Sequence, residues 1–323
     1  MKAALFTDRA SFEKYSDWTG AGWDLVFLGR GAPDPATITA TGAEVLVVDP
    51  MMKIGQEIIS GMPGLNLIQS LGVGYNGIDL DAARSAGIYV CNNAGVNAMP
   101  VAEQAVLLIL ALLRRFRCYE DMVYAGRQIE AKTACFENGL TELCELSVGI
   151  IGYGDIGKAL ISLLKPFGCK IYYYTRSGDH NLDGVEYMPL DELYASCDIV
   201  SLNLPVTPET TNMINEETLK RFKPGAILIN TARGELMDND AVAAALNSGR
   251  LGGLGADTIA PAPVQADNPL LCALTEESRL RVALSPHIGG ITTGCSIRAF
   301  AQIRENIEAI ERGQKPKNVV NSL

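Results

Sequence analysis

The chain has 323 residues, of which 48% are hydrophobic and 20% charged, and its formal net charge is −10 at pH 7. This composition is typical of a soluble globular protein, and the length suggests two domains. The negative charge argues against nucleic acid and anionic membranes as partners, and the longest apolar run, residues 105–113, is far below the roughly 18 residues that span a bilayer.

The N-terminus lacks the long apolar region and cleavage site of a signal peptide, which indicates a cytoplasmic protein. Eight cysteines occur, none of them in a Cys-x-x-Cys pattern. We interpret them as reduced, buried thiols in preference to disulfide or metal roles, and we expect no metal site.

Residues 1 to about 96 alternate short apolar runs with helical segments. Strands are predicted at 2–6, 44–48, 65–70 and 87–91, with helices such as 54–60 and 80–86 between them. This predicts a small flavodoxin-like α/β domain. The loop 72–77 follows the third strand, at the edge where open α/β sheets bind ligands. The glycines on either side of Val73 would let backbone N–H groups bind an anion, although an ordinary loop is the alternative.

A long helix is predicted next, from Pro100 to about Tyr124. Its central run, residues 105–113, is apolar all round, which indicates a buried helix. Residues 126–145 are polar, and we expect an irregular connection there.

The second α/β unit extends from about residue 146 to 290. Strands are predicted at 148–151, 170–175, 199–202, 226–230, 253–257 and 281–284, and helices at 158–167, 190–195, 215–221 and 239–247. So many strands with crossover helices predict a doubly wound parallel sheet of the Rossmann type. An amphipathic helix, 293–312, would lead the chain back to the first domain. A dinucleotide-binding domain, 99–290, is therefore expected to be nested within a smaller substrate-binding domain, 1–98 with 291–323.

Three glycines with the G-x-G-x-x-G spacing follow the strand 148–151. Gly152 would allow the tight turn, Gly154 the approach of a pyrophosphate, and Gly157 close packing of helix on strand. The helix N-terminus would offer free N–H groups to the phosphates. These features predict dinucleotide binding, with a purely structural glycine turn as the alternative.

The end of the second strand of this unit decides which dinucleotide is expected. NAD-binding sites carry an acidic residue there, but residues 174–177 contain none. Thr175, Arg176 and Ser177 instead suit a 2′-phosphate, so we favour NADP(H). NAD(H) remains possible through Asp179, which lies beyond the strand end.

With these pieces placed, the chain resembles the D-isomer-specific 2-hydroxyacid dehydrogenase family over essentially its full length. The resemblance rests on ordered motifs: Gly72-Val73-Gly74-Tyr75-Asn76-Gly77-Ile78-Asp79, Val101-Ala102-Glu103, the glycine loop, Leu204-Pro205-Val206-Thr207-Pro208-Glu209-Thr210, Asn230-Thr231-Ala232-Arg233-Gly234-Glu235, Gly255-Ala256-Asp257 and Ser285-Pro286-His287-Ile288-Gly289-Gly290. It implies reversible hydride transfer between a nicotinamide ring and a 2-keto acid, and a homodimer formed through the cofactor domain.

Arg233 and His287 are the expected catalytic residues. The guanidinium of Arg233 follows a strand and would anchor the substrate carboxylate and polarise the carbonyl, although a structural ion pair is the alternative. His287 is one of only two histidines, and an ordinary histidine pKa of about 6.5 suits a proton donor. The other histidine, His180, is expected to be solvated surface.

The remaining site residues follow from the resemblance. The N–H groups of Val73 and Gly74 are expected to hold the substrate carboxylate, and Met51, Met52 and Tyr75 to line an apolar side-chain pocket, unless the methionines are core residues. Asp257 is expected near the nicotinamide amide, and Asp155 to contribute its backbone only. The full expected cofactor set is Val101, Gly152, Gly154, Asp155, Ile156, Gly157, Thr175, Arg176, Ser177, Leu204, Pro205, Thr210, Thr231, Ala232, Arg233, Asp257, His287 and Gly290.

The chain departs from the family at one catalytic position. Family members normally place a glutamate five residues after the equivalent of Asp257, where it orients the catalytic histidine; here that residue is Ala262, and Asp267 is too far along to replace it. We therefore expect a 2-keto acid reductase of reduced activity. The alternative is a dinucleotide-binding sensor or interaction protein with little or no catalysis.

Overall fold

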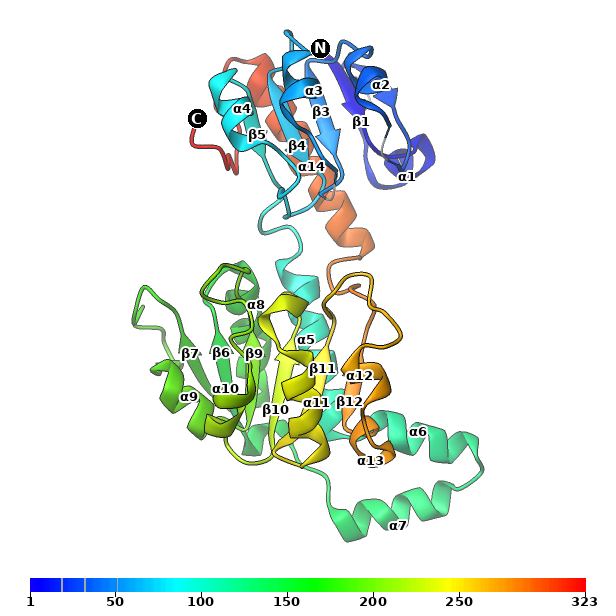
Figure 1. The fold of residues 1–323 in the computed structure, drawn as a ribbon, viewed down its shortest axis with the longest axis vertical. Coiled ribbons are helices and arrows are strands. Elements are labelled where there is room, and N and C mark those ends of the chain that lie inside the picture. Colours follow the sequence, from blue (N-terminus) through cyan, green and yellow to red (C-terminus); the bar gives the residue numbers. More distant parts are fainter. Residues whose placement is uncertain (19, 32, 51) are drawn as a thin grey trace. The chain divides into compact units, whose positions relative to one another are not determined.

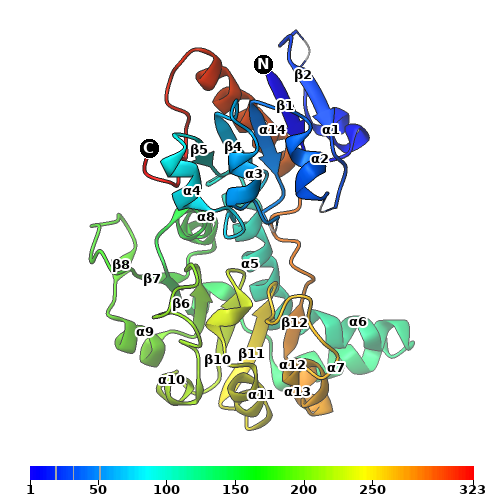
Figure 2. The same cartoon turned by 45° about the horizontal axis from the view of Figure 1, so that its top comes forward.

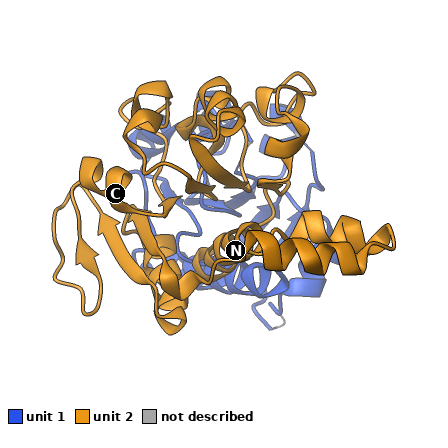
Figure 3. Ribbon diagram, turned by 90° about the horizontal axis from the view of Figure 1, so that it is seen from below, with its two compact units in different colours: residues 1–96, 291–323 blue, residues 97–290 orange. Residues whose placement is uncertain are grey.

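The computed structural model describes residues 1–18, 20–31, 33–50 and 52–323, so Met51 lies outside the described residues. The chain divides into two compact units, residues 1–96 with 291–323 (unit 1) and residues 97–290 (unit 2), coloured separately in Figure 3. The boundaries expected from the sequence differ from these by at most two residues.

Unit 1 is built on a five-stranded parallel sheet with the order β2-β1-β3-β4-β5, labelled in Figure 1. This is the flavodoxin-like order. Its strands and helices are β1 (Lys2–Leu5), α1 (Arg9–Tyr15), β2 (Asp24–Phe27), α2 (Pro35–Thr39), β3 (Val45–Val48), α3 (Gln56–Ser60), β4 (Leu67–Ser70), α4 (Leu80–Ser85), β5 (Tyr89–Cys91) and α14 (Thr293–Glu311).

Both faces of this sheet are buried, and alternate residues of each strand face opposite cores. Leu46 and Ile68 contact the core that α2, α3 and α4 complete, whereas Val45 and Leu67 contact the core shared with α1 and α14. Continuous apolar strands are the expected result of covering a parallel sheet on both sides.

Unit 2 contains a seven-stranded parallel sheet with the order β12-β11-β10-β9-β6-β7-β8, which confirms the predicted doubly wound fold. Its elements are α5 (Ala98–Leu113), α6 (Phe116–Tyr124), α7 (Gln128–Asn138), η1 (Leu143–Glu145), β6 (Ser147–Ile151), α8 (Asp155–Leu164), η2 (Lys165–Phe167), β7 (Lys170–Tyr174), β8 (Glu186–Tyr187), α9 (Leu190–Ser196), β9 (Ile199–Leu202), α10 (Glu216–Arg221), β10 (Ala226–Asn230), η3 (Gly234–Leu236), α11 (Asn239–Asn247), β11 (Leu251–Ala256), α12 (Pro269–Cys272), α13 (Glu276–Arg279) and β12 (Val282–Leu284). Helices α5 and α8 cover one face of the sheet, and α9, α10, α11 and α12 cover the other.

The segment between residues 100 and 145 differs from its prediction. The expected single helix is divided into α5 and α6, because Arg115 adopts a left-handed conformation with φ of 47° that an α-helix cannot continue through. The expected irregular connection contains α7. Leu107, within the run predicted to be fully buried, is 58% exposed.

Helices α6 and α7 pack against each other as a hairpin that extends away from the sheet of unit 2 (Figures 1 and 2). α6 buries no side chain and α7 buries only Ala131. The hairpin exposes large apolar side chains that belong to Phe116, Val123, Tyr124, Ile129 and Phe136. Among the described residues, no helix combines the length and the apolar character needed to cross a bilayer.

Candidate functional site

The glycine loop lies between β6 and α8 and is tightly packed at two of its three glycines. A Cβ on Gly152, whose φ is +104°, would lie 2.3 Å from the carbonyl oxygen of Asn203, and a Cβ on Gly157 would lie 2.2 Å from the carbonyl oxygen of Gly152. A Cβ on Gly154 would meet nothing within 4 Å. Gly154 is also the N-cap of α8, whose first turn presents N–H groups that intrahelical bonds cannot satisfy. The loop therefore has open space where the helix dipole favours an anion.

Buried polar atoms without partners lie at the carboxyl ends of the neighbouring strands. Asn203 Oδ1, Thr231 Oγ1 and Thr258 Oγ1 have no hydrogen-bond partner among the described residues, although Thr231 and Thr258 are only 6% and 4% exposed. Successive side chains of a strand point to opposite faces of the sheet. Ile199 and Ile229 contact the core formed with α5 and α8. Asn203 and Thr231 follow them by an even number of positions, so they are expected on the same face of the sheet. A bound dinucleotide would supply the missing partners, so these residues fit such a ligand.

Of these three residues, only Thr231 was expected from the sequence. Asn203 directly follows the buried strand β9, and Thr258 lies two positions after the end of the buried strand β11. The carboxyl end of such a strand is the usual ligand edge, which is the signal that could have identified them.

The segment after β7 forms a polar cluster. Thr175 Oγ1 lies 3.3 Å from Ser177 Oγ, which lies 2.7 Å from His180 Nε2. His180 is exposed, as expected, but its ring also lies 5.3 Å from the ring of Tyr153 in the glycine loop. Arg176 is exposed beside this cluster.

Asp179, the alternative ribose ligand, is engaged within the protein. Its Oδ1 accepts a hydrogen bond from the hydroxyl of Tyr173 at 2.7 Å and another from the N–H of Asn181 at 2.8 Å. The Tyr173 bond, followed by the Asn181 bond, holds the pKa of Asp179 below its usual value. This carboxylate thus remains charged and already has partners.

Arg233 lies in the loop after β10 and is exposed. Its guanidinium donates to the carbonyl of Ala232 at 2.8 Å and forms no ion pair with a described residue. The buried side chain of Asn230 fixes the loop, because it donates to the Arg233 carbonyl at 2.8 Å and accepts from the Ala232 N–H at 3.1 Å. The positive charge is therefore held in place and available to an anion.

Asp257 and His287 follow β11 and β12 in the same unit. Asp257 is 2% exposed, and its carboxylate accepts hydrogen bonds from Ser285 Oγ and from the N–H groups of Ile288 and Gly289. His287 is exposed and has a φ of +58°. Gly290, expected to contact the cofactor, lies near Asn97 and Val101 at the start of α5.

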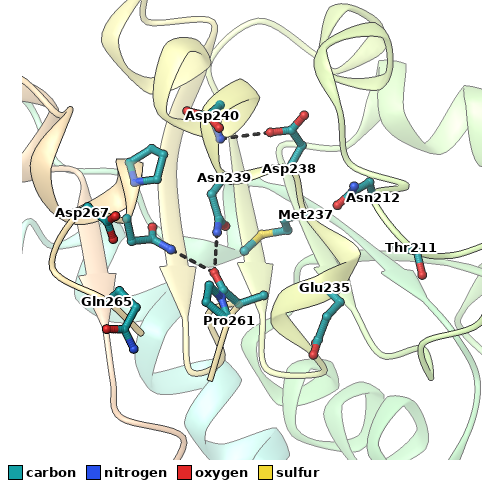
Figure 4. Close-up of a pocket in the computed structure, with 13 residues that line it drawn as sticks. Thr211, Asn212, Glu235, Met237, Asp238, Asn239, Asp240, Pro261, Gln265 and Asp267 are labelled. Carbon is teal, nitrogen blue, oxygen red and sulfur yellow. Dashed lines mark hydrogen bonds between the residues drawn. The ribbon is translucent and has the colours of Figure 1, made fainter. Parts of the chain in front are cut away.

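Ala262 lies in the exposed segment between β11 and α12. Beside this segment is a cavity of about 670 Å³, shown in Figure 4, which is lined by Glu235, Asp238, Asp240 and Asp267 among others. Asp267 therefore contributes to an acidic cavity. Arg233 and His287 are not among the residues that line it.

The loop after β4 in unit 1 turns its carbonyl groups toward buried side chains. Ser70 Oγ donates to the Gly74 carbonyl at 2.6 Å, and Asn92 Nδ2 donates to the Val73 carbonyl at 2.8 Å. The N–H groups of Val73 and Gly74 have no partner among the described residues. This arrangement suits an anion.

The two unit 1 residues expected in the side-chain pocket have different surroundings. Met52 packs in the core of unit 1 and is 8% exposed. Tyr75 is half-buried against the same core.

Comparisons with known proteins give concordant matches. A family model described as D-isomer specific 2-hydroxyacid dehydrogenase, NAD binding domain, matches residues 106–289. Glyoxylate reductase of Korarchaeum cryptofilum is 36% identical over 279 residues, which are 85% of this chain and 81% of that protein. Glyoxylate reductase of Aeropyrum pernix is 33% identical over 98% of this chain and 95% of its own length. The structure of the NAD-complexed D-isomer specific 2-hydroxyacid dehydrogenase from Lactobacillus delbrueckii ssp. bulgaricus matches with a TM-score of 0.83 and 26% identity, over 99% of both chains.

Replacement of Gly154 separates ligand binding from folding. Because a Cβ at this position meets only open space, we expect Gly154→Ala to fold normally but to raise the Kd for the dinucleotide about tenfold, or about 1.4 kcal/mol. Fluorescence titration and thermal unfolding measure the two effects. Gly64→Ala is the matched control, since Gly64 also faces open space but lies in unit 1. An unchanged Kd in Gly154→Ala would contradict a close approach of the ligand to this loop.

Proposed function

Because the chain belongs to the D-isomer-specific 2-hydroxyacid dehydrogenase family, we propose that it reduces 2-keto acids to D-2-hydroxy acids with NADP(H) as the favoured cofactor. The observation that carries this proposal is the exposed guanidinium of Arg233 at the carboxyl edge of the sheet, which forms no ion pair with a described residue and lies on a loop whose backbone Asn230 holds. A protein that only sensed the dinucleotide would have no use for a fixed cation of this kind. Glyoxylate, the substrate in the names of the two reductases above, is the first substrate to test.

Reduction of a 2-keto acid adds a hydride to the carbonyl carbon and a proton to its oxygen. The bound nicotinamide supplies the hydride. Arg233 binds the carboxylate and polarises the carbonyl, because a guanidinium offers parallel donors and a permanent charge. In unit 1, the Val73 and Gly74 N–H groups, which have no partner among the described residues, suit an anion of this kind. His287 donates the proton to the carbonyl oxygen, as a histidine can near neutral pH.

Ala262 favours the second candidate function, a dinucleotide sensor with little catalysis. The exposed segment around Ala262 carries no carboxylate at the family's position for orienting the histidine. We propose that turnover is reduced but present, since Arg233 and His287 remain. NADPH binding without oxidation by any 2-keto acid in a broad panel would favour the sensor.

Restoring the carboxylate tests this account. We expect Ala262→Glu to raise the turnover of keto-acid reduction by about 10-fold to 10³-fold, because an oriented general acid is worth such factors. Steady-state NADPH oxidation measures the change. Ala266→Glu is the control, because it places the same charge in the same exposed segment and should leave turnover unchanged. If both variants behave like the wild type, our interpretation of position 262 is wrong.

The cofactor preference rests on Arg176 and its neighbours. We propose that Thr175, Arg176 and Ser177 bind the 2′-phosphate of NADP(H), while Asp179 is occupied by Tyr173 and Asn181. The wild type should then have a lower KM for NADPH than for NADH. Arg176→Ala should raise the KM for NADPH by about 10-fold to 100-fold, because this is the loss of affinity expected when one charge-assisted hydrogen bond is removed. The KM for NADH should change little. Arg279→Ala, which removes another exposed arginine of unit 2, is the control. A lower KM for NADH in the wild type would reverse the assignment.

The α6–α7 hairpin supports the proposal of a homodimer. Phe136, Ile129 and Tyr124 are 81%, 74% and 85% exposed, and apolar surface of this extent is typical of an interface. A second copy of the chain, which would present the same hairpin, is the proposed occupant.

We expect the double variant Ile129→Lys/Phe136→Lys to be monomeric in sedimentation equilibrium, because two cations per chain would be buried without partners. Both side chains are exposed in the single chain, so folding should be unaffected. Phe167→Lys, which alters an apolar residue that is 39% exposed outside the hairpin, should remain dimeric. A monomeric wild type would refute the proposed dimer.

A further inference from the structure

We propose that Asp257, Ser285 and Gln104 form a polar clamp that positions His287 through its backbone. The inference rests on the proposed function, in which His287 donates the proton. It assigns to Asp257 a role besides its expected contact with the nicotinamide amide. In this chain, the clamp fixes a histidine that lacks the family's orienting carboxylate at position 262.

The carboxylate of Asp257 is at the centre of the clamp. Its Oδ1 accepts hydrogen bonds from Ser285 Oγ at 2.5 Å and from the Ile288 N–H at 3.0 Å, and its Oδ2 accepts from the Gly289 N–H at 2.8 Å. The residue is 2% exposed. A buried carboxylate with several donors is strongly bound to them, because each lost bond would leave charge unsolvated.

Gln104 on α5 extends the clamp to the helix layer. Its Nε2 donates to Ser285 Oγ at 2.9 Å, so the serine hydroxyl must direct its own proton toward Asp257. Gly289 permits the close packing, since a Cβ there would lie 2.9 Å from Asp257 Oδ2 and 3.3 Å from the Cβ of Gln104. Helix α5 and strands β11 and β12 are thereby joined at one point.

His287 lies between the anchored residues. Ser285 is held by its side chain and by its N–H, which donates to the Ala256 carbonyl at 2.9 Å, and Ile288 and Gly289 are held by Asp257. Pro286, the residue before His287, has its own φ fixed by its ring. The left-handed conformation of His287, with φ of +58°, costs a non-glycine residue free energy and persists only where its surroundings enforce it.

The side chain of His287, in contrast, has no hydrogen bond to a described residue. Its Cα position and Cα–Cβ direction are therefore set by the backbone alone. Strained, left-handed residues of this kind are concentrated at functional sites. A clamp that served only stability would have no need to maintain the strain at this residue.

The variant Ser285→Ala tests the clamp, because it removes one bond to Asp257 and the partner of Gln104 while leaving both backbone bonds. We expect kcat for keto-acid reduction to fall about tenfold to a hundredfold, because a small misplacement of a catalytic group has an effect of this size. The KM for NADPH should change less than about twofold. The solvent isotope effect on kcat should rise, since proton transfer becomes slower. Ser285→Thr should restore turnover, and Gln104→Met should reproduce the loss in part.

Ser278→Ala is the matched control. It removes another buried hydroxyl of unit 2, one that donates to the carbonyl of Leu246 rather than to Asp257. A loss of folded protein alone would lower the apparent turnover of either serine variant without changing the isotope effect. That result for Ser285→Ala would overturn the clamp.

A second measurement decides the clamp without catalysis. The chain contains only two histidines, so protein labelled at the histidine Cε1 gives two ring signals, which His180→Gln assigns. In Ser285→Ala we expect the His287 signal to show faster motion and the His180 signal to be unchanged. An unaltered His287 signal would refute the clamp. A wild type that reduces no 2-keto acid would refute the proposed function, while this signal would still decide the clamp.

Discussion

One constraint, the parallel pairing of the strands of unit 2, sets where the loops that carry most of its candidate site residues begin. The last residues of six neighbouring strands are paired with one another in one continuous row across the sheet, which consists of Ile151, Tyr174, Leu202, Asn230, Ala256 and Leu284. The next residue of each strand therefore falls in a second row, which consists of Gly152, Thr175, Asn203, Thr231, Asp257 and Ser285. Backbone bonds such as Asn203 N–H to Ile151 and Ser285 N–H to Ala256 continue the ladder into this row. Parallel strands all end at the same edge of the sheet. Residues that are far apart in the sequence are therefore brought close together there by the strand pairing alone.

The two kinds of residue in this row are held differently. Gly152 and Asp257 are rigidly packed, one against the backbone of Asn203 and the other against the segment after β12. Thr231 is buried and Asn203 is half-buried, and each has a buried side-chain oxygen without a hydrogen-bond partner among the described residues. This combination favours a site that needs both a fixed shape and polar groups ready to bind a ligand, because preorganised groups lose little entropy when a ligand binds.

Much of this arrangement was accessible from the sequence, for a physical reason. Strands β9 and β10 were predicted with the bounds that the structure shows, because a strand buried on both faces is a short, continuous apolar run. Strands β2 and β8 were missed, since they lie at the edges of their sheets and contain no fully buried residue, so neither is a continuous run of buried apolar residues. The break at Arg115 was also missed, because nothing in a run of arginines signals a left-handed residue.

The contacts within the site were harder to predict than its members. Asp257 and His287 were predicted from their motifs, but the bonds from Ser285, Ile288 and Gly289 to Asp257 join residues about 30 positions apart. No local pattern indicates which donors a buried carboxylate will meet. The same holds for Asp179, which looked available to a ribose in the sequence and is engaged by Tyr173 and Asn181 in the structure.

A histidine can be oriented in two ways, and the difference bears on what this chain can do. A carboxylate beside the ring fixes the tautomer, the ring rotation and the charge of the imidazolium at once. A backbone clamp fixes only the Cα–Cβ direction, so the ring still rotates and the tautomer is set by solvent. If His287 is the proton donor, as we propose, the clamp around Asp257 preserves its position but not its full orientation. Reduced, rather than absent, turnover is the consequence that this distinction favours, because positioning and orientation contribute separately to the barrier.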